Sequence, residues 1–422
     1  MRMIRAIAFL LTLVPLVLSA QTSKSSAADS GGSLRLDDEA SRRAVDDLMN
    51  RSQASNARPM ESLHFGGVPL TRPDAERARE VLRAAHDRRV KADRSVEVAT
   101  STVAAAGKTM KYFKAVYGEP DRRGRSLYIS MHGGGASPAS VNDAQWKNQR
   151  LLYRPAEGVY VAPRAPSDTW NLWHEAHIDP LFERLIETLV AIDGVDPDRV
   201  YLMGYSAGGD GVYQLAPRLA DRFAAAAMMA GHPNETRPDG LRNLPFAIHV
   251  GADDAAFGRN AVAESWRKAL GDLNAADPKG YVFRVDIHPG KGHWMDREDA
   301  SAVPWMAKFR RNLRPERIVW LQDDVVHRRF YWLSVDDAKP GERIVASRRQ
   351  NTIRIDAAPA NRKIVLLLDD DVVDLDRPIR VQRGDRIIHE GRCARTIDAM
   401  EATLGERGDV GGIFFAALPV PE

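Results

Sequence analysis

The feature that most constrains how this chain can fold is an apolar run that stops at a serine between two glycines. Residues 200–203 read Val-Tyr-Leu-Met, and residues 204–208 read Gly-Tyr-Ser-Ala-Gly. A serine at a sharp turn from a buried strand into a helix needs glycine two positions before and after it, because a Cβ there would meet the neighbouring strand or helix. The pattern therefore predicts a strand, a strained turn with Ser206 at its tip, and a helix.

The same turn predicts chemistry at Ser206. A helix that begins directly after the serine points its unpaired N–H groups at one place, so the N–H of Ala207 is a candidate donor to a negatively charged oxygen. Residues 196–199 ahead of the run read Asp-Pro-Asp-Arg, which is typical of a turn, and residues 209–216 continue as a helix start. Ser206 is therefore the candidate nucleophile.

Short apolar runs alternate with helical patterns through residues 94–315, which we expect to form one catalytic domain. Such alternation is typical of the α/β class, with a doubly wound, mostly parallel sheet and helices on both faces. In these sheets ligands bind beyond the carboxyl ends of the strands. Two further strands, 95–104 and 110–117, are expected to pair around Gly107. The core strands are expected at residues 127–131, 158–162, 199–203, 223–229, 245–250 and 281–287, with helices at 181–192 and 261–270 among them.

The N-terminal part of the chain has a different texture. Residues 1–20 combine Arg2 and Arg5 with an apolar run and a final Ser-Ala pair, which is typical of a cleavable signal peptide. The run is short for a membrane span, so we expect no stable membrane insertion after removal and a secreted or periplasmic protein. An uncleaved anchor is the alternative. Residues 21–93 are expected to be a disordered leader followed by helices at 36–49 and 72–90.

The C-terminal part, residues 316–422, consists of short strand-like runs separated by turn signals. This texture predicts a β-sandwich-like domain. The sequence Arg-Gly-Asp at 383–385 is expected to be a hairpin turn rather than an adhesion motif. The strand-like runs are 317–321, 328–335, 343–346, 352–355, 363–368, 379–381, 386–389 and 412–418.

Composition excludes several classes of function. The formal charge of +3 includes the two leader arginines, so the mature chain is nearly neutral, which argues against nucleic acid or an anionic membrane as a partner. A single cysteine, Cys393, excludes an internal disulfide. No metal-ligand spacing such as H-E-x-x-H is present, and we expect no metal and no organic cofactor. The sequence leaves the oligomeric state open.

A serine at such a turn needs a general base that is itself held by a carboxylate, in the chain order serine, acid, histidine. The strand 245–250 ends in Gly-Ala followed by Asp253 and Asp254, either of which could supply the carboxylate. The last strand leads into a glycine-rich loop that carries His293, which is the candidate base. His288 is the weaker candidate because the proline after it stiffens the chain.

The strand at residues 127–131 is followed by His-Gly-Gly-Gly at 132–135. Glycines at this place expose backbone N–H groups without side chains in the way. Gly133 and Gly134 are therefore candidate oxyanion donors, together with the N–H of Ala207.

Aromatic and imidazole side chains gather on loops that follow the predicted strands. Trp170, Trp173 and His174 lie on one such loop, Trp294 follows the candidate base, and His232 follows the strand 223–229. These five are candidate substrate-binding residues. The pattern leaves open whether the two tryptophans of the first loop form a substrate wall or pack that loop onto the sheet.

From about Lys108 to about Leu313, these motifs resemble the α/β-hydrolase superfamily, and the segment DPDRVYLMGYSAGG is most similar to secreted esterases of the feruloyl esterase and polyhydroxyalkanoate depolymerase type. In that family the acid usually lies three residues after the turn glycine, which favours Asp254. The resemblance implies a serine carboxylesterase that cleaves a small-molecule or polymer-linked ester through an acyl-enzyme. The alternatives are a serine peptidase of the same fold and a glycan- or surface-binding protein that acts through its C-terminal sandwich.

Overall fold

The computed structural model describes residues 37–53, 64–360 and 362–420, and every element named below lies in these ranges. The expected signal peptide and disordered leader lie outside them. Across the described residues no helix is both long and apolar enough to cross a membrane. The described residues belong to one compact unit. The expected domain boundaries at 93/94 and 315/316 stay predictions.

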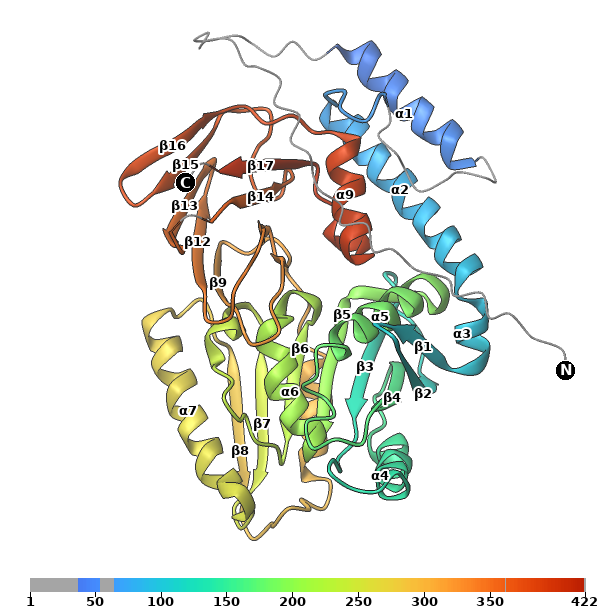
Figure 1. The fold of residues 1–422 in the computed structure, drawn as a ribbon, viewed down its shortest axis with the longest axis vertical. Coiled ribbons are helices and arrows are strands. Elements are labelled where there is room, and N and C mark those ends of the chain that lie inside the picture. Colours follow the sequence, from blue (N-terminus) through green and yellow to red (C-terminus); the bar gives the residue numbers. More distant parts are fainter. Residues whose placement is uncertain (1–36, 54–63, 361, 421–422) are drawn as a thin grey trace, which may run out of the picture. The chain divides into compact units, whose positions relative to one another are not determined.

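An eight-stranded sheet with the order β1-β2-β4-β3-β5-β6-β7-β8 is the largest sheet of the described residues and lies in the lower half of Figure 1. The strands from β4 to β8 along this order run parallel, and β1 and β2 add an antiparallel hairpin at one edge. The expected mostly parallel α/β fold is confirmed. The strands are β1 (Thr102–Ala105), β2 (Lys108–Tyr117), β3 (Arg125–Met131), β4 (Gly158–Arg164), β5 (Val195–Tyr205), β6 (Ala225–Met229), β7 (Phe246–Gly251) and β8 (Phe283–His288).

The central strands are continuous apolar runs because both of their faces are covered. On β3, Leu127 and Ile129 belong to one hydrophobic cluster, and Tyr128 between them belongs to a second cluster on the other face. The first cluster includes side chains of α5 (Ile178–Asp193), α6 (Ala207–Arg218) and α7 (Arg259–Ala276). The second includes side chains of α4 (Ala139–Leu152) and α8 (Ala302–Met306).

The connections around β3 determine where a site can form. The chain leaves β3 through α4 to β4 on one side and returns through α5 to β5 on the other side. At such a reversal the loops that follow the two central strands part from each other and leave a crevice at their carboxyl ends. The 132–135 loop follows β3, and Ser206 follows β5, so both lie at this crevice.

The N-terminal segment forms α1 (Asp38–Gln53) and α2 (Arg72–Asp93), as expected. Thr71 caps α2 by accepting a hydrogen bond from the N–H of Asp74. The strand expected at 95–104 is wrong in its first half, where α3 (Ser95–Thr100) ends at a left-handed Ser101 before β1 begins. The alternating valines misled the prediction, because Val96 is 72% exposed and does not face the core.

The C-terminal region contains two sheets, as the expected β-rich texture implies (Figure 1). One has the order β10-β11-β14-β17 and the other β16-β15-β13-β12-β9. Arg383 pairs with Arg386 across the β15–β16 turn, so the Arg-Gly-Asp sequence is a hairpin turn, as predicted. One helix, α9 (Ile397–Arg407), was not expected. The strands are β9 (Arg317–Leu321), β10 (Arg329–Phe330), β11 (Leu333–Val335), β12 (Arg343–Arg349), β13 (Thr352–Ala357), β14 (Ile364–Leu368), β15 (Ile379–Arg383), β16 (Arg386–Gly391) and β17 (Ala416–Val420).

Candidate active site

Ser206 lies at a strained turn between the end of β5 and the start of α6. Its backbone has φ 58° and ψ −122°, a combination that L residues rarely adopt. A Cβ on Gly204 would collide with the backbone of Gly208, and a Cβ on Gly208 would collide with the carbonyl of Met131. The two glycines of the motif are therefore required by close backbone approach, and the turn holds the serine side chain at the carboxyl end of the sheet.

Ser206, His293 and Asp254 are hydrogen-bonded in series. The Oγ of Ser206 lies 3.0 Å from Nε2 of His293, and Nδ1 of His293 lies 2.8 Å from Oδ2 of Asp254. A carboxylate only accepts hydrogen bonds, so Nδ1 carries the proton and Nε2 is left to accept from the serine hydroxyl. Three side chains that were expected to meet from three separate loops are brought together.

The alternatives that the sequence left open lie elsewhere. Asp253 is exposed, whereas Asp254 is 2% exposed and faces His293. His288 points to other partners: its Nε2 lies 3.2 Å from Nδ1 of His249, and its Nδ1 lies 3.1 Å from Oε2 of Glu298. Neither Asp253 nor His288 takes part in the hydrogen-bonded series.

The glycine loop after β3 lies against the serine. A Cβ on Gly133 would stand 3.0 Å from Cβ of Ser206. The N–H of Gly135 donates to Oδ1 of Asn142 at 2.9 Å. Within the described ranges no hydrogen-bond partner is found for the N–H groups of Gly133, Gly134 and Ala207. These three N–H groups are therefore available to an oxygen atom, and those of Gly133 and Ala207 belong to residues directly beside Ser206.

A buried histidine and tryptophan support the glycine loop from below. Nε2 of His132 accepts a hydrogen bond from the N–H of Ala165 at 3.1 Å, and burial lowers the pKa of His132 to about 4. Trp173 donates from Nε1 to the carbonyl of His132 at 2.9 Å and is fully buried. Trp173 therefore packs in the core, which is the second of the two roles that the sequence left open, and it offers no surface to a substrate.

Three exposed aromatic side chains lie on the loops that carry the candidate residues. Trp170 is 61% exposed, and its carbonyl lies 2.9 Å from where a Cβ on Gly135 would stand. Trp294 is 50% exposed beside His293. Phe257, on the loop after Asp254, is 80% exposed and was missed by sequence reasoning. We call Trp170, Phe257 and Trp294 the aromatic rim.

The two remaining sequence candidates are imidazoles. His174 packs edge-on against Trp170 with ring centroids 5.5 Å apart, and burial lowers its pKa to about 4. The N–H of His232 donates to Oδ1 of Asp210 at 2.6 Å, and its Nδ1 accepts from the N–H of Asn234 at 2.9 Å. His174 therefore packs beside the exposed Trp170. His232 connects its own loop to Asp210 at the start of α6.

Two charged residues of the site were missed because each lies beside a motif rather than in it. Asp210 follows Ser206 by one helical turn, and burial raises its pKa to about 6. Arg259 begins α7 five residues after Asp254. Its side chain is 11% exposed, and Nη1 lies 3.4 Å from Oδ1 of Asp254 and 3.5 Å from Nδ1 of His293. The glycine before Arg259, which marks a helix start after the acid, was the available signal.

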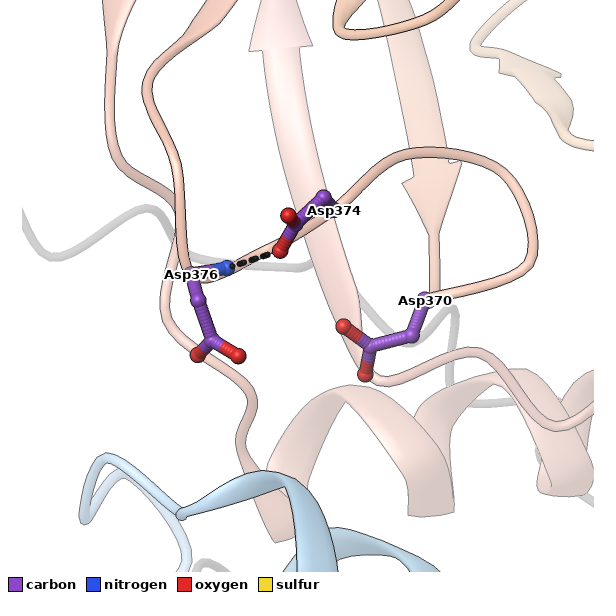
Figure 2. A group of neighbouring side chains, drawn as sticks. All are labelled: Asp370, Asp374 and Asp376. Atoms are coloured by element: carbon purple, nitrogen blue, oxygen red, sulfur yellow. Dashed lines mark hydrogen bonds between the residues drawn. The ribbon is translucent and has the colours of Figure 1, made fainter.

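One group of carboxylates in the described residues has spacing that could hold a metal ion. Asp370, Asp374 and Asp376 lie on the loop after β14, as Figure 2 shows. The guanidinium of Arg395 already contacts two of them, with Nη2 2.6 Å from Oδ1 of Asp370 and Nη1 2.7 Å from Oδ1 of Asp376. The arginine compensates these charges, so we interpret the group as an ion-pair cluster that stabilises the loop.

The arrangement at the end of β5 can activate a hydroxyl group. A serine whose proton can pass to an imidazole, with a buried carboxylate behind the imidazole, can attack a carbonyl carbon. Free N–H groups beside it can hold the oxygen that becomes negative.

Comparison with known proteins finds hydrolases among the relatives of this chain. Residues 161–310 match the model of the Dienelactone hydrolase family, which lies in the α/β-hydrolase superfamily. A relative named "Putative esterase NocK", from Nocardia uniformis subsp. tsuyamanensis, is 34% identical over 166 residues, which are 35% of this chain and 47% of the relative. The chain thus spans about half the length of this relative.

The solved structures to which the chain is similar include esterases. The similarity to a thermostable esterase covers 50% of this chain and 62% of the esterase chain, with 20% identity and a TM-score of 0.37. The similarity to a ferulic acid esterase covers 49% of this chain and 96% of the esterase chain, with 15% identity and a TM-score of 0.34. The match of residues 161–310 to the family model confirms the superfamily that the sequence motifs resemble.

Proposed function

On the premise that residues 161–310 belong to the dienelactone hydrolase family, we propose that this protein is a serine hydrolase that cleaves carboxylic esters through an acyl-enzyme. The observation that carries the proposal is the hydrogen-bonded series of Ser206, His293 and Asp254. The free N–H groups of Gly133, Gly134 and Ala207 support it. Chemistry of this type requires no metal and no organic cofactor.

The first half of the reaction forms the acyl-enzyme. The Oγ of Ser206 attacks the ester carbonyl carbon while its proton moves to Nε2 of His293, and Asp254 stabilises the imidazolium through Nδ1. The carbonyl oxygen becomes negative and is held by the free backbone N–H groups. When the tetrahedral intermediate collapses, the bond to the alcohol oxygen breaks and His293 gives its proton to that leaving oxygen.

The second half releases the acid. Water attacks the acyl-enzyme as Nε2 of His293 takes one of its protons, and the bond between the carbonyl carbon and Oγ breaks. His293 returns the proton to Ser206, so the enzyme is regenerated and one water is consumed for each ester.

The aromatic rim supports a substrate with a ring near the scissile bond. Trp170, Phe257 and Trp294 are each at least half exposed around the carboxyl end of the sheet. Exposed aromatic faces stack on aryl and sugar rings. We infer an aryl- or sugar-linked ester, either small or attached to a polymer.

Purified protein and its Ser206→Ala variant are compared on chromogenic acyl esters of increasing chain length, an aryl-acid ester and a peptide anilide. Loss of the nucleophile lowers kcat by roughly 10⁶-fold where the serine acts in a unit with its base. Ser265→Ala, on an exposed position of α7, is the matched control and keeps full activity. If the folded wild-type protein cleaves none of the substrates, or Ser206→Ala cleaves as fast, the proposal fails. Cleavage of the anilide alone would favour a peptidase.

We also propose that the protein is exported, because residues 1–20 have the composition of a signal peptide. Intact-mass measurement of protein recovered outside the cytoplasm is expected to give a chain that begins near residue 21. A chain that retains residues 1–20 would instead indicate an uncleaved anchor.

A further inference from the structure

The carboxylate of Asp254 has one oxygen bound to His293 and the other turned to an arginine. Oδ2 lies 2.8 Å from Nδ1 of His293, and Oδ1 lies 3.4 Å from Nη1 of Arg259. The side chain of Asp254 is 1% exposed. A carboxylate removed from water needs compensation at both oxygens. In the part of the chain that the structure describes, Arg259 is the only donor found for Oδ1.

Arg259 is held close to this pair without a short bond to one acceptor. Its Nη1 lies 3.4 Å from Asp254, 3.5 Å from the carbonyl of Ala256 and 3.5 Å from Nδ1 of His293. Charge-assisted hydrogen bonds are typically about 2.7–2.9 Å long. The guanidinium lies over the ring of Phe257, 4.9 Å from its centroid. The charge is thus placed by packing and by the start of α7, at a distance from which it acts on both partners.

A positive charge in this place opposes a second positive charge on His293. The imidazole must be unprotonated to accept the proton of Ser206. Arg259 disfavours the imidazolium, and Asp254 favours it. Asp210, from α6, interacts electrostatically with both Arg259 and His293 and acts against the arginine. Burial raises the pKa of Asp210 to about 6, so this counter-charge is present above that pH.

The other groups around His293 do not change this balance. The hydroxyl of Tyr205 donates to the carbonyl of His293 at 2.6 Å, and burial raises the pKa of Tyr205, so it stays neutral. On the loop of His293 itself, Lys291 and Asp296 are paired with each other at 2.8 Å. The charged groups that act on His293 are therefore Asp254, Arg259 and Asp210.

We propose that Arg259 is a positioning residue of the hydrolase site: it fixes the carboxylate of Asp254 and keeps His293 unprotonated between turnovers, with Asp210 as its counter-charge. The inference rests on the proposed function, because it assigns a role within the same reaction. It also explains why an arginine nearly nine-tenths buried lacks a short ion pair.

The test is the pH profile of kcat/KM for an ester that the wild-type enzyme cleaves in a Ser206-dependent way. Arg259→Leu is expected to move the acidic limb to higher pH by about one unit, because a nearby charge shifts a titration by this order. It is also expected to lower kcat more than it changes KM, because a positioning residue acts through Asp254 and His293. Asp210→Asn is expected to move the same limb to lower pH, and the double variant to lie between the two.

Opposite shifts from two neighbouring substitutions distinguish an electrostatic role from a loss of packing, which would move both profiles down without moving the limb. Arg259→Lys, which keeps the charge, restores the limb to the wild-type position. Arg267→Leu, two turns along α7, is the control and leaves the profile unchanged. If Arg259→Leu does not fold, Arg259→Gln, which removes the charge but keeps a polar side chain, decides in its place. An acidic limb that coincides with wild type in the folded variants overturns the inference, whereas absence of any Ser206-dependent hydrolysis overturns the proposed function instead.

Discussion

Each end of helix α6 lies beside a network of charged groups around one aspartate, half-buried Asp210 at one end and buried Asp409 at the other, and the two networks are built in opposite ways. At the first turn, Asp210 lies beside Ser206, and burial raises its pKa to about 6. Beyond the last turn lies Asp409, which contacts Arg222 of η1 (Ala220–Arg222). Burial alone would raise the pKa of Asp409, but Arg311 and Arg222 outweigh it and hold that pKa well below its usual range. α6 has 12 residues and is therefore about 18 Å long.

The difference lies in how far each charge is compensated. The carboxylate of Asp409 is contacted by Nη1 of Arg311 at 2.7 Å and by Nη1 of Arg222 at 2.7 Å, and it accepts a hydrogen bond from the N–H of Gly411 at 3.1 Å. Asp210 receives the N–H of His232, and Arg259 acts on it without a short ion pair. The far network stabilises the contact between the α/β sheet region and the C-terminal region. The network at Ser206 leaves the charge of Asp210 without a close ion-pair partner. Functional sites often contain such groups, which lower the stability of the folded protein.

The largest expected effect comes from removing charge at the far end. Asp409→Asn leaves Arg311 and Arg222 buried beside a neutral side chain, and breaking a buried pair in this way costs about 3–5 kcal/mol. Urea unfolding at pH 7.5 measures the change in the free energy of unfolding. Ester turnover per folded molecule stays at the wild-type level, because Asp409 is remote from Ser206. A loss below about 1 kcal/mol would show that the arginines find other acceptors and that the contrast between the two networks is not real.

Sequence reasoning reached the parts of this molecule in which one local constraint decides the structure. The turn at Ser206 needs glycine at 204 and 208, and the collisions that a Cβ would cause there are the ones that the motif implies. The sheet could be predicted because its strands are covered on both faces and therefore appear in the sequence as short, continuous apolar runs between helical patterns. The histidine and the two acids after the last strands were found by their order along the chain.

The missed parts depend on contacts between distant residues or on weak local signals. The sequence left open whether Trp173 forms a substrate wall or packs its loop, and only the structure shows that its Nε1 donates to the carbonyl of His132 in the core. Arg259 becomes part of the site only because α7 starts beside Asp254. Helix α9 did carry local signals, with Thr396 as its cap and a left-handed Gly408 at its end, but the strand-rich texture around it outweighed them.

A smaller effect, of opposite sign, is expected at Asp210, the aspartate without a close ion-pair partner. The pKa of Asp210 is raised from an unfolded value of about 3.9, so the folded state binds its proton more tightly and loses stability as pH rises through about 6. Asp210→Asn removes this cost while its amide oxygen still accepts from His232. At pH 8 the variant is expected to be more stable by roughly 1–3 kcal/mol. The gain disappears near pH 4, where the wild-type carboxyl is protonated.

Urea unfolding of wild type and Asp210→Asn at pH 8, 6 and 4 measures the effect. The same substitution that destabilises the protein at Asp409 thus stabilises it at Asp210. Destabilisation at pH 8 would mean that Asp210 is compensated after all, and the two ends of α6 would then be alike.

The smallest effect is expected at an ion pair that is short but exposed. Comparing it with Asp409 tests whether the strength of an ion pair in this protein depends on its length or on its burial. Lys268 and Asp272 on α7 lie 2.6 Å apart, closer than Asp409 to either arginine, yet their side chains are 79% and 68% exposed. Water compensates both charges when the pair is broken, and the aspartate follows the lysine, which is the less favourable order along a helix. Asp272→Asn is therefore expected to change the free energy of unfolding by less than about 0.5 kcal/mol. Urea unfolding under the conditions used for Asp409→Asn provides the comparison. A loss as large as that at Asp409 would show that distance, rather than removal from water, sets the strength of the ion pairs in this protein.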